Sequence, residues 1–220
     1  MKDLRRLLCF RHIGLPVALL VFALGCSGGD GSNQAPVLAD FGGNDPNVVV
    51  AFGDSITEGV DGGGAPYPGR LAALSGRRVI NAGAGGQESG AGLSRLGSTL
   101  AAYKPGYICI LFGANDVIMG LDQNVTIGNL LAMIQKAKAN KTVPILATLT
   151  PMIGEHAGWN SEVNRLNDAL RNLASAEGVT LVDLNAEFVD AAALMIGDGL
   201  HPNDQGNQII ALAFNDTLPH

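Results

Sequence analysis

The sequence is poor in cysteine, in charged residues and in aromatic residues. Three of its 220 residues are cysteines, 15% are charged and 5% are aromatic. So few cysteines exclude a small scaffold held together by disulfide bridges. The low charged fraction accompanies an apolar fraction of 47%. This excludes a disordered chain and, at this length, predicts one globular domain with a sizeable core.

Basic runs and two common chemical signatures are also missing. No segment rich in Lys and Arg follows the first dozen residues, and the formal net charge is −6. Because nucleic-acid binding requires a basic face, we expect no nucleic-acid partner. The chain contains neither the Gly-Lys dipeptide of a phosphate-binding loop nor the His-Glu-x-x-His motif of zinc proteases.

An apolar run near the N-terminus, Ile13–Leu24, is too short to span a bilayer comfortably. Basic residues precede it and small residues end it before Cys26, which is the pattern of a signal peptide. The residues before Cys26 resemble the lipobox of bacterial lipoproteins, with Ala23 where Leu is usual. We predict a lipoprotein signal over 1–25 and a lipid on Cys26, with a plain secretory signal as the alternative.

This reading predicts an exported protein of the bacterial cell envelope, held at the outer membrane or the periplasmic face through Cys26. Residues 26–47 are rich in Gly, Ser, Asn and Pro, which predicts a flexible tether ahead of a folded domain over 48–220. Without residues 1–25 the chain has 10 Lys and Arg and 19 Asp and Glu, so its net charge becomes −9. Such a charge favours solubility, and we expect a monomer.

Short β-branched runs alternate with helical patterns along the domain. Strands separated by helices form βαβ units with right-handed crossovers, so we predict an α/β fold with a mainly parallel, five-stranded sheet between helices. In such sheets ligands bind beyond the carboxyl ends of the strands. The predicted strands are Val48–Phe52, Arg78–Asn81, Tyr107–Phe112, Val143–Leu149 and Thr180–Leu184, and the predicted helices lie near Tyr67–Ser75, Ala91–Tyr103, Thr126–Ala139, Ser161–Glu177 and Asp204–Asn215.

Ser55 directly follows the first predicted strand and is a candidate nucleophile. A serine needs a base within hydrogen-bond reach to react at neutral pH. His201 has Asp198 three residues before it in a turn that contains glycine, and a carboxylate there can orient the imidazole. His156 has no Asp at such a spacing, and His220 ends the chain, so we favour His201 as the base.

Acyl transfer also needs hydrogen-bond donors for the oxyanion. The glycine-rich segment Asn81–Gly86 follows the second predicted strand, and Asn115 follows the third. Each of these polar residues has a simpler explanation as a turn or a helix cap. All of them leave the same edge of the predicted sheet, however, and together they favour a site.

Four blocks of the sequence resemble those of the SGNH (GDSL-type) hydrolases. They are Gly53-Asp54-Ser55-Ile56, Asn81–Gly86, Gly113-Ala114-Asn115-Asp116 and Asp198-Gly199-Leu200-His201. The resemblance implies a flavodoxin-like three-layer α/β/α sandwich without metal or cofactor. It also implies a triad of Ser55, His201 and Asp198, and an oxyanion hole of the Ser55 N–H, the Gly86 N–H and the Asn115 side chain.

Within that family the chain is most similar to bacterial arylesterases, thioesterases and lysophospholipases. The resemblance implies hydrolysis of a small-molecule ester, thioester or lipid through an acyl-Ser55 intermediate. Because no segment is long enough to form a large lid, we expect a shallow site that takes short or medium acyl chains. Two alternatives remain open. Trp159 lies in a loop that fits stacking on sugar, which would suit a carbohydrate O-acetylesterase, and the same scaffold also fits a binding module without activity.

Overall fold

Five strands occupy the five predicted apolar runs in the computed structural model, which describes residues 39–60 and 62–219. The predicted signal, 1–25, and Cys26 lie outside the described residues. The strands are β1 (Asp45–Gly53), β2 (Arg78–Gly83), β3 (Pro105–Leu111), β4 (Val143–Ala147) and β5 (Thr180–Val182).

The long helices also follow the predicted pattern, and shorter ones join them. The long helices are α2 (Tyr67–Ser75), α3 (Ser89–Tyr103), α5 (Gln123–Ala139), α6 (Asn160–Glu177) and α9 (Asp204–Asn215), and the short ones are α1 (Ser55–Glu58), α4 (Ala114–Ile118), the 3₁₀ helix η1 (Gly154–Trp159), α7 (Leu184–Glu187) and α8 (Ala191–Leu194).

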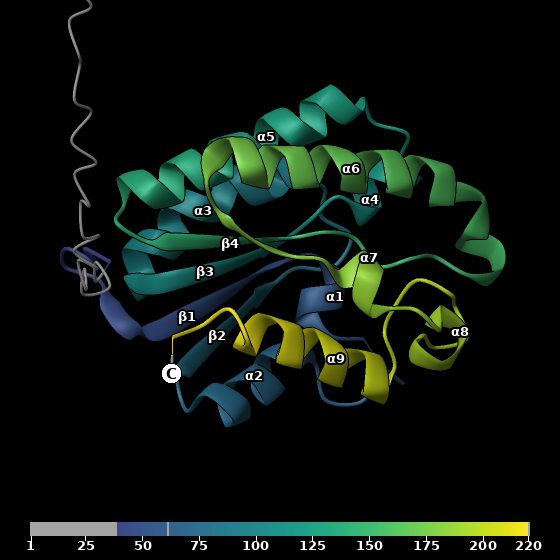
Figure 1. Cartoon of the computed structure of the whole chain (residues 1–220), viewed down its shortest axis with the longest axis horizontal. Helices are drawn as coiled ribbons and strands as arrows, with labels where there is room; N and C mark the ends of the chain where they lie inside the picture. The colour runs from purple at the N-terminus through teal and green to yellow at the C-terminus, as the bar shows by residue number, and fades with distance from the viewer. Residues whose placement is uncertain (1–38, 61, 220) are drawn as a thin grey trace, which may run out of the picture. The chain divides into compact units, whose positions relative to one another are not determined.

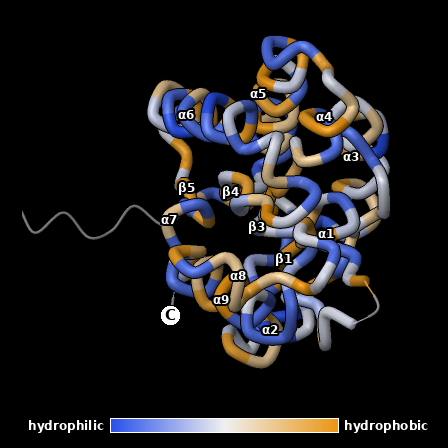
Figure 2. Tube along the Cα trace, turned by 90° about the vertical axis from the view of Figure 1, so that its right-hand side faces the viewer, coloured by the Kyte–Doolittle hydropathy of each residue, from blue (hydrophilic) through white to orange (hydrophobic). Residues whose placement is uncertain are grey.

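The sheet has the strand order β2-β1-β3-β4-β5, and every pairing is parallel. This is the flavodoxin-like order. Helices α3, α5 and α6 cover one face of the sheet and α2 and α9 cover the other (Figure 1). The view turned by 90° shows the same three layers, with the sheet between them (Figure 2). The predicted α/β/α sandwich is therefore confirmed.

The central strands carry the core because helices cover both of their faces. Every residue of β3 is buried, and so are residues 48–53 of β1. Strands buried on both faces read as continuous apolar runs, which is why both could be found in the sequence. Cys109 lies in β3 with no exposed surface, and burial raises the pKa of its thiol.

The folded body begins before the predicted tether boundary at residue 47. Strand β1 starts at Asp45, and the ring of Phe41 packs edge-on against Tyr107, with the ring centroids 5.3 Å apart. The Asn44 side chain also donates a hydrogen bond to the Asn140 carbonyl at 2.6 Å. Residues 41–47 thus belong to the body, because they contact residues that are distant in the sequence.

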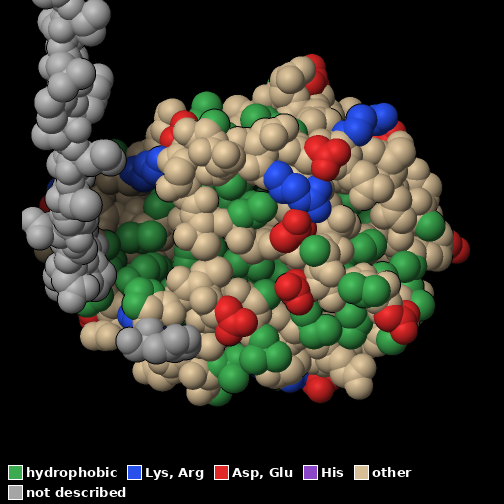
Figure 3. Space-filling model, viewed as in Figure 1, with side chains coloured by type: hydrophobic (Ala, Val, Ile, Leu, Met, Phe, Trp, Pro, Cys, Tyr) green, Lys and Arg blue, Asp and Glu red, His purple; other side chains and the backbone are tan. Residues whose placement is uncertain are grey.

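Polar and apolar side chains are mixed on the face shown in Figure 3, where acidic and basic groups lie near one another. No helix within residues 39–60 and 62–219 is both long and apolar enough to cross a membrane.

Candidate active site

Ser55 is the first residue of α1, directly beyond the end of β1. The N-cap of this helix is Asp54, whose Oδ1 accepts a hydrogen bond from the Ile56 N–H at 3.0 Å. Gly53 permits the sharp turn into α1, because a Cβ atom there would lie 2.0 Å from the Thr57 hydroxyl oxygen and 2.6 Å from the Leu111 carbonyl oxygen. Glycine is therefore required at position 53 on steric grounds.

The structure brings Ser55, His201 and Asp198 into one hydrogen-bonded chain. Ser55 Oγ lies 2.8 Å from His201 Nε2, and His201 Nδ1 lies 2.6 Å from Asp198 Oδ2. A proton on Nδ1 donates to the carboxylate, which leaves Nε2 of the neutral ring to accept the serine proton. This is the arrangement in which an imidazole activates a serine.

A rigid turn holds the Asp198 and His201 side chains together. Gly199 has a φ of +74°, and a Cβ atom there would lie 2.2 Å from the Ile153 carbonyl oxygen. The Ile153 N–H in turn donates to the Gly199 carbonyl at 2.8 Å. Asp198 Oδ1 accepts from the N–H groups of Leu200 and His201 at 2.9 and 3.0 Å.

These contacts keep Asp198 ionised. Burial by itself would raise the pKa of Asp198, but hydrogen bonds from the Leu200 N–H and from the ring and N–H of His201 outweigh burial, so the pKa is lowered. A carboxylate that stays charged can stabilise an imidazolium on His201.

Among the described residues, no hydrogen bond joins His156 to Ser55. His156 instead contacts the turn that carries Asp198 and His201. Its Nδ1 lies 2.9 Å from the carbonyl oxygen of Asp198. The imidazole in contact with Ser55 is that of His201.

Three segments, here called the donor loops, follow β2, β1 and β3 and carry Gly86, Ser55 and Asn115 respectively, with Ser55 in the short helix α1 and Asn115 in the short helix α4. The side-chain nitrogen of Asn115 donates to the Gln87 carbonyl at 3.0 Å and lies 3.4 Å from Asp54 Oδ2. Because Gln87 follows Gly86 and Asp54 precedes Ser55, this one amide links all three loops. Gly86 has a φ of +69°, a conformation that favours glycine.

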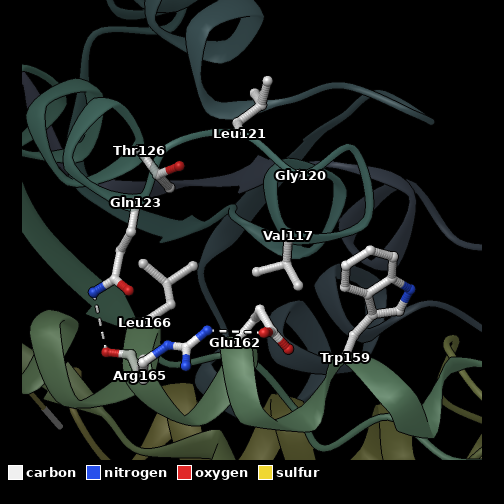
Figure 4. Close-up of a pocket in the computed structure, with 9 residues that line it drawn as sticks. All are labelled: Val117, Gly120, Leu121, Gln123, Thr126, Trp159, Glu162, Arg165 and Leu166. Atoms are coloured by element: carbon white, nitrogen blue, oxygen red, sulfur yellow. Dashed lines mark hydrogen bonds and ion pairs between the residues drawn. The ribbon is translucent and has the colours of Figure 1, made fainter.

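A pocket of about 220 Å³ lies beside the Asn115 loop. Figure 4 shows Val117, Leu121 and Leu166 among its lining residues, with Trp159 at one side. Glu162 and Arg165, which also line it, form an ion pair at 2.8 Å. The pocket thus combines apolar walls with a charged rim.

Within the described part of the chain, no three His, Cys, Asp or Glu side chains gather closely enough to hold a metal ion.

Comparisons with known proteins identify the family. Residues 51–209 match the model described as "GDSL-like Lipase/Acylhydrolase family". This match spans more than half of the chain, so the chain belongs to that family. It is an acyl ester hydrolase of the GDSL type.

Curated relatives are consistent with this class. Esterase TesA of Pseudomonas aeruginosa is 34% identical over 57% of this chain and 61% of its own length, so the chain spans less than two thirds of it. The thioesterase 1/protease 1/lysophospholipase L1 of Escherichia coli is 28% identical over 80% of this chain and 85% of its own length.

A third relative and one solved structure extend the comparison. Lipoprotein YqeF of Bacillus subtilis is 28% identical over 65% of this chain and 72% of its own length. The structure of a lipolytic protein of the G-D-S-L family from Desulfitobacterium hafniense superposes with a TM-score of 0.70 at 25% identity, covering 77% of this chain and 98% of the other.

Asp54 is the N-cap of α1, and its burial gives it a second property. Its side chain is nearly inaccessible to solvent. Burial raises the pKa of Asp54 from 3.8 to about 7, with a smaller contribution from the negative charge of Asp116, although the Ile56 N–H lowers it. The continuous apolar run of β1 gives no sign of this, because the burial of Asp54 comes from the segments around it.

We predict that Asp54 makes the folding stability fall between about pH 4 and pH 7. In this range the unfolded chain has lost the proton that the folded protein keeps, so rising pH favours unfolding, by up to about 4 kcal/mol from this group. Asp54→Asn stays neutral and retains an acceptor for the Ile56 N–H. Its melting temperature, relative to the unmodified protein, should therefore rise from about pH 4 to pH 7.

The control for this measurement is Asp122→Asn. Asp122 is also an N-cap, accepting from the Asn124 N–H at 2.8 Å, but it lies in an exposed position. Melting curves of Asp54→Asn that run parallel to those of the unmodified protein at every pH would contradict the proposed protonation of Asp54.

Proposed function

We propose that the protein hydrolyses carboxylic esters or thioesters through a covalent acyl intermediate on Ser55. The observation that carries the proposal is the continuous contact from Ser55 Oγ to His201 Nε2 (2.8 Å) and from His201 Nδ1 to Asp198 Oδ2 (2.6 Å). Family membership supports the reaction class, and this geometry supports the assignment of the roles.

In the first half-reaction His201 Nε2 takes the proton of Ser55 while Ser55 Oγ attacks the acyl carbon. The C–O or C–S bond to the leaving group then breaks, and His201 returns the proton to the departing oxygen or sulfur. In the second half-reaction His201 deprotonates water, which attacks the acyl carbon. The bond from that carbon to Ser55 Oγ then breaks, His201 returns the proton to Ser55 Oγ, and the acid is released. Asp198 stabilises the imidazolium in both halves.

The donor loops provide the oxyanion hole in this proposal. As the first residue of α1, Ser55 has an N–H without an acceptor inside the helix. The Gly86 N–H and the Asn115 side chain complete the set. Losing one such donor costs about 3–4 kcal/mol of barrier in a well-studied enzyme, so the placement of these three groups decides the rate.

Ser55→Ala should lower kcat for a short nitrophenyl ester by about 10⁴-fold or more, since the nucleophile is lost. A fluorophosphonate should also fail to label the variant, as shown by mass spectrometry. Ser94→Ala, which removes an exposed hydroxyl from α3, is the matched control and should behave like the unmodified protein. Near-normal turnover by a folded Ser55→Ala protein would refute the assignment.

The acyl chain occupies the pocket lined by Val117, Leu121 and Leu166 in this proposal. Val117, which lines the pocket, lies two residues beyond Asn115. The pocket volume of about 220 Å³ is below the roughly 300 Å³ of drug-sized sites. This size fits short and medium chains. Each buried methylene should improve kcat/KM by about fourfold until the pocket is full.

Leu121→Trp should shorten the preferred acyl chain, because the larger side chain fills the pocket. In a series from acetyl to decanoyl nitrophenyl esters, kcat/KM should fall for octanoyl while it is retained for acetyl. Leu212→Trp is the control, since Leu212 on α9 is 42% exposed and Leu121 is 44% exposed. An unchanged chain-length profile would contradict the acyl pocket, and higher kcat/KM for acetylated sugars would favour the O-acetylesterase.

The proposal also includes export and lipid anchoring. The relative YqeF, which is called a lipoprotein, and the lipobox-like residues before Cys26 support it. The enzyme would then act in the cell envelope, with Cys26 as its membrane attachment.

Cys26→Ser should release the protein from the membrane fraction of a bacterial host, because the lipidated residue is lost. Cys9→Ser changes the other cysteine of the same N-terminal region and should leave the protein in the membrane fraction. If the unmodified protein is already in the soluble fraction, the lipoprotein assignment is wrong.

A further inference from the structure

A half-buried arginine on α3, Arg95, contacts the donor loops and the strand ends that lead into them. Its Nη2 donates to the Gly53 carbonyl at 2.9 Å, and its Nε donates to the Gln87 side-chain oxygen at 2.7 Å. Its guanidinium carbon lies 4.2 Å from the ring centroid of Phe52 and 5.8 Å from that of Phe112. Partial burial lowers the pKa of Arg95, but a guanidinium remains charged at neutral pH.

Each of these contacts lies close in the chain to a proposed oxyanion donor. Gly53 comes two residues before Ser55, Gln87 directly follows Gly86, and Phe112 comes three residues before Asn115. The Gly53 carbonyl also accepts from the Ala84 N–H at 3.1 Å. One side chain thus contacts all three donor loops.

The link to Asn115 passes through Gln87. The Gln87 side chain accepts from Arg95, while its backbone carbonyl accepts from the Asn115 amide at 3.0 Å. Arg95 therefore fixes the residue on which the orientation of the Asn115 donor depends. Arg95 lies 42 residues from Gly53 in the sequence. The hydrogen bond between them therefore forms only when the sheet is folded.

Close packing of α3 makes these contacts possible. A Cβ atom on Gly92 would lie 2.6 Å from the Phe112 ring, so glycine lets the helix approach. Phe52 and Phe112 pack edge to face with centroids 5.3 Å apart, and the guanidinium covers this pair. A planar guanidinium can donate in fixed directions within its plane while its face stacks on an aromatic ring, whereas the compact ammonium of Lys has no planar face to stack.

We propose that Arg95 is a positioning residue for the oxyanion hole, which it holds in its reactive geometry by bridging the three donor loops. The inference rests on the proposed role of Ser55. Arg95 is not in contact with the reacting atoms in this proposal. It acts through Gly53, Gln87 and the aromatic pair.

Arg95→Lys is the central test because it keeps the positive charge but loses the planar fork. We expect kcat for a short nitrophenyl ester to fall by about 10-fold to 100-fold, with KM changed by less than about threefold, because donor placement acts on the transition state. Inhibition by an alkyl boronic acid, which forms a tetrahedral adduct with serine, should weaken by the same factor as kcat/KM.

Arg77→Lys is the matched control. Arg77 also donates to backbone carbonyls, those of Pro46 and Pro219, and its guanidinium carbon lies 5.2 Å from the ring centroid of Tyr107. These contacts lie near the amino ends of β1 and β3. This variant should lose stability to a similar extent by thermal melting, but its kcat and boronate inhibition should change by less than about twofold.

Equal kcat values for the two variants would overturn the inference, as would a loss in Arg95→Lys that appears in KM alone. Failure of the proposed acyl-Ser55 mechanism can be distinguished from failure of the Arg95 role, because it would appear as turnover by Ser55→Ala. An inactive Ser55→Ala protein together with a fully active Arg95→Lys protein would therefore reject only the role of Arg95.

Discussion

The parallel pairing of β1 with both β2 and β3 is the constraint on which the rest of the structure depends. Its register places Gly53 level with Gly83 on one side and with Leu111 on the other. Three chain segments that are far apart in the sequence therefore leave the sheet at the same height. Hydrogen bonds among these segments follow from that alignment, such as the one from the Ala84 N–H to the Gly53 carbonyl and the one from the Asn115 amide to the Gln87 carbonyl.

Buried polar groups around this edge are paired, and their pairing specifies the loops. Asp116 is nearly inaccessible and accepts from the Ser89 N–H at 2.9 Å and from the Thr126 hydroxyl at 3.0 Å. It thereby joins α4 to the starts of α3 and α5. Because a buried polar group without a partner is costly, such networks allow few other conformations of the segments that carry Ser55 and Asn115.

Local patterns in the sequence were sufficient to predict the five strands, which read as short apolar runs, and the long helices, which have enough residues to show their periodicity. The short helices α1, α4, α7 and α8 have four or five residues, too few for a period, and Asp54, Asp183 and Asp190 cap three of them. The contact of Ser55 with His201 was foreseen because both follow turn signals at one sheet edge. Arg95 was not, because its partners come together only through strand pairing.

Both ends of the described chain meet the body at the edge opposite to Ser55. Phe41 packs near the start of β3, and the Pro219 carbonyl accepts from Arg77, just before β2. Strand β1 runs from that edge to the serine over nine residues, or about 30 Å. A label or linker attached at Phe41 or Pro219 would therefore lie at the sheet edge opposite to Ser55.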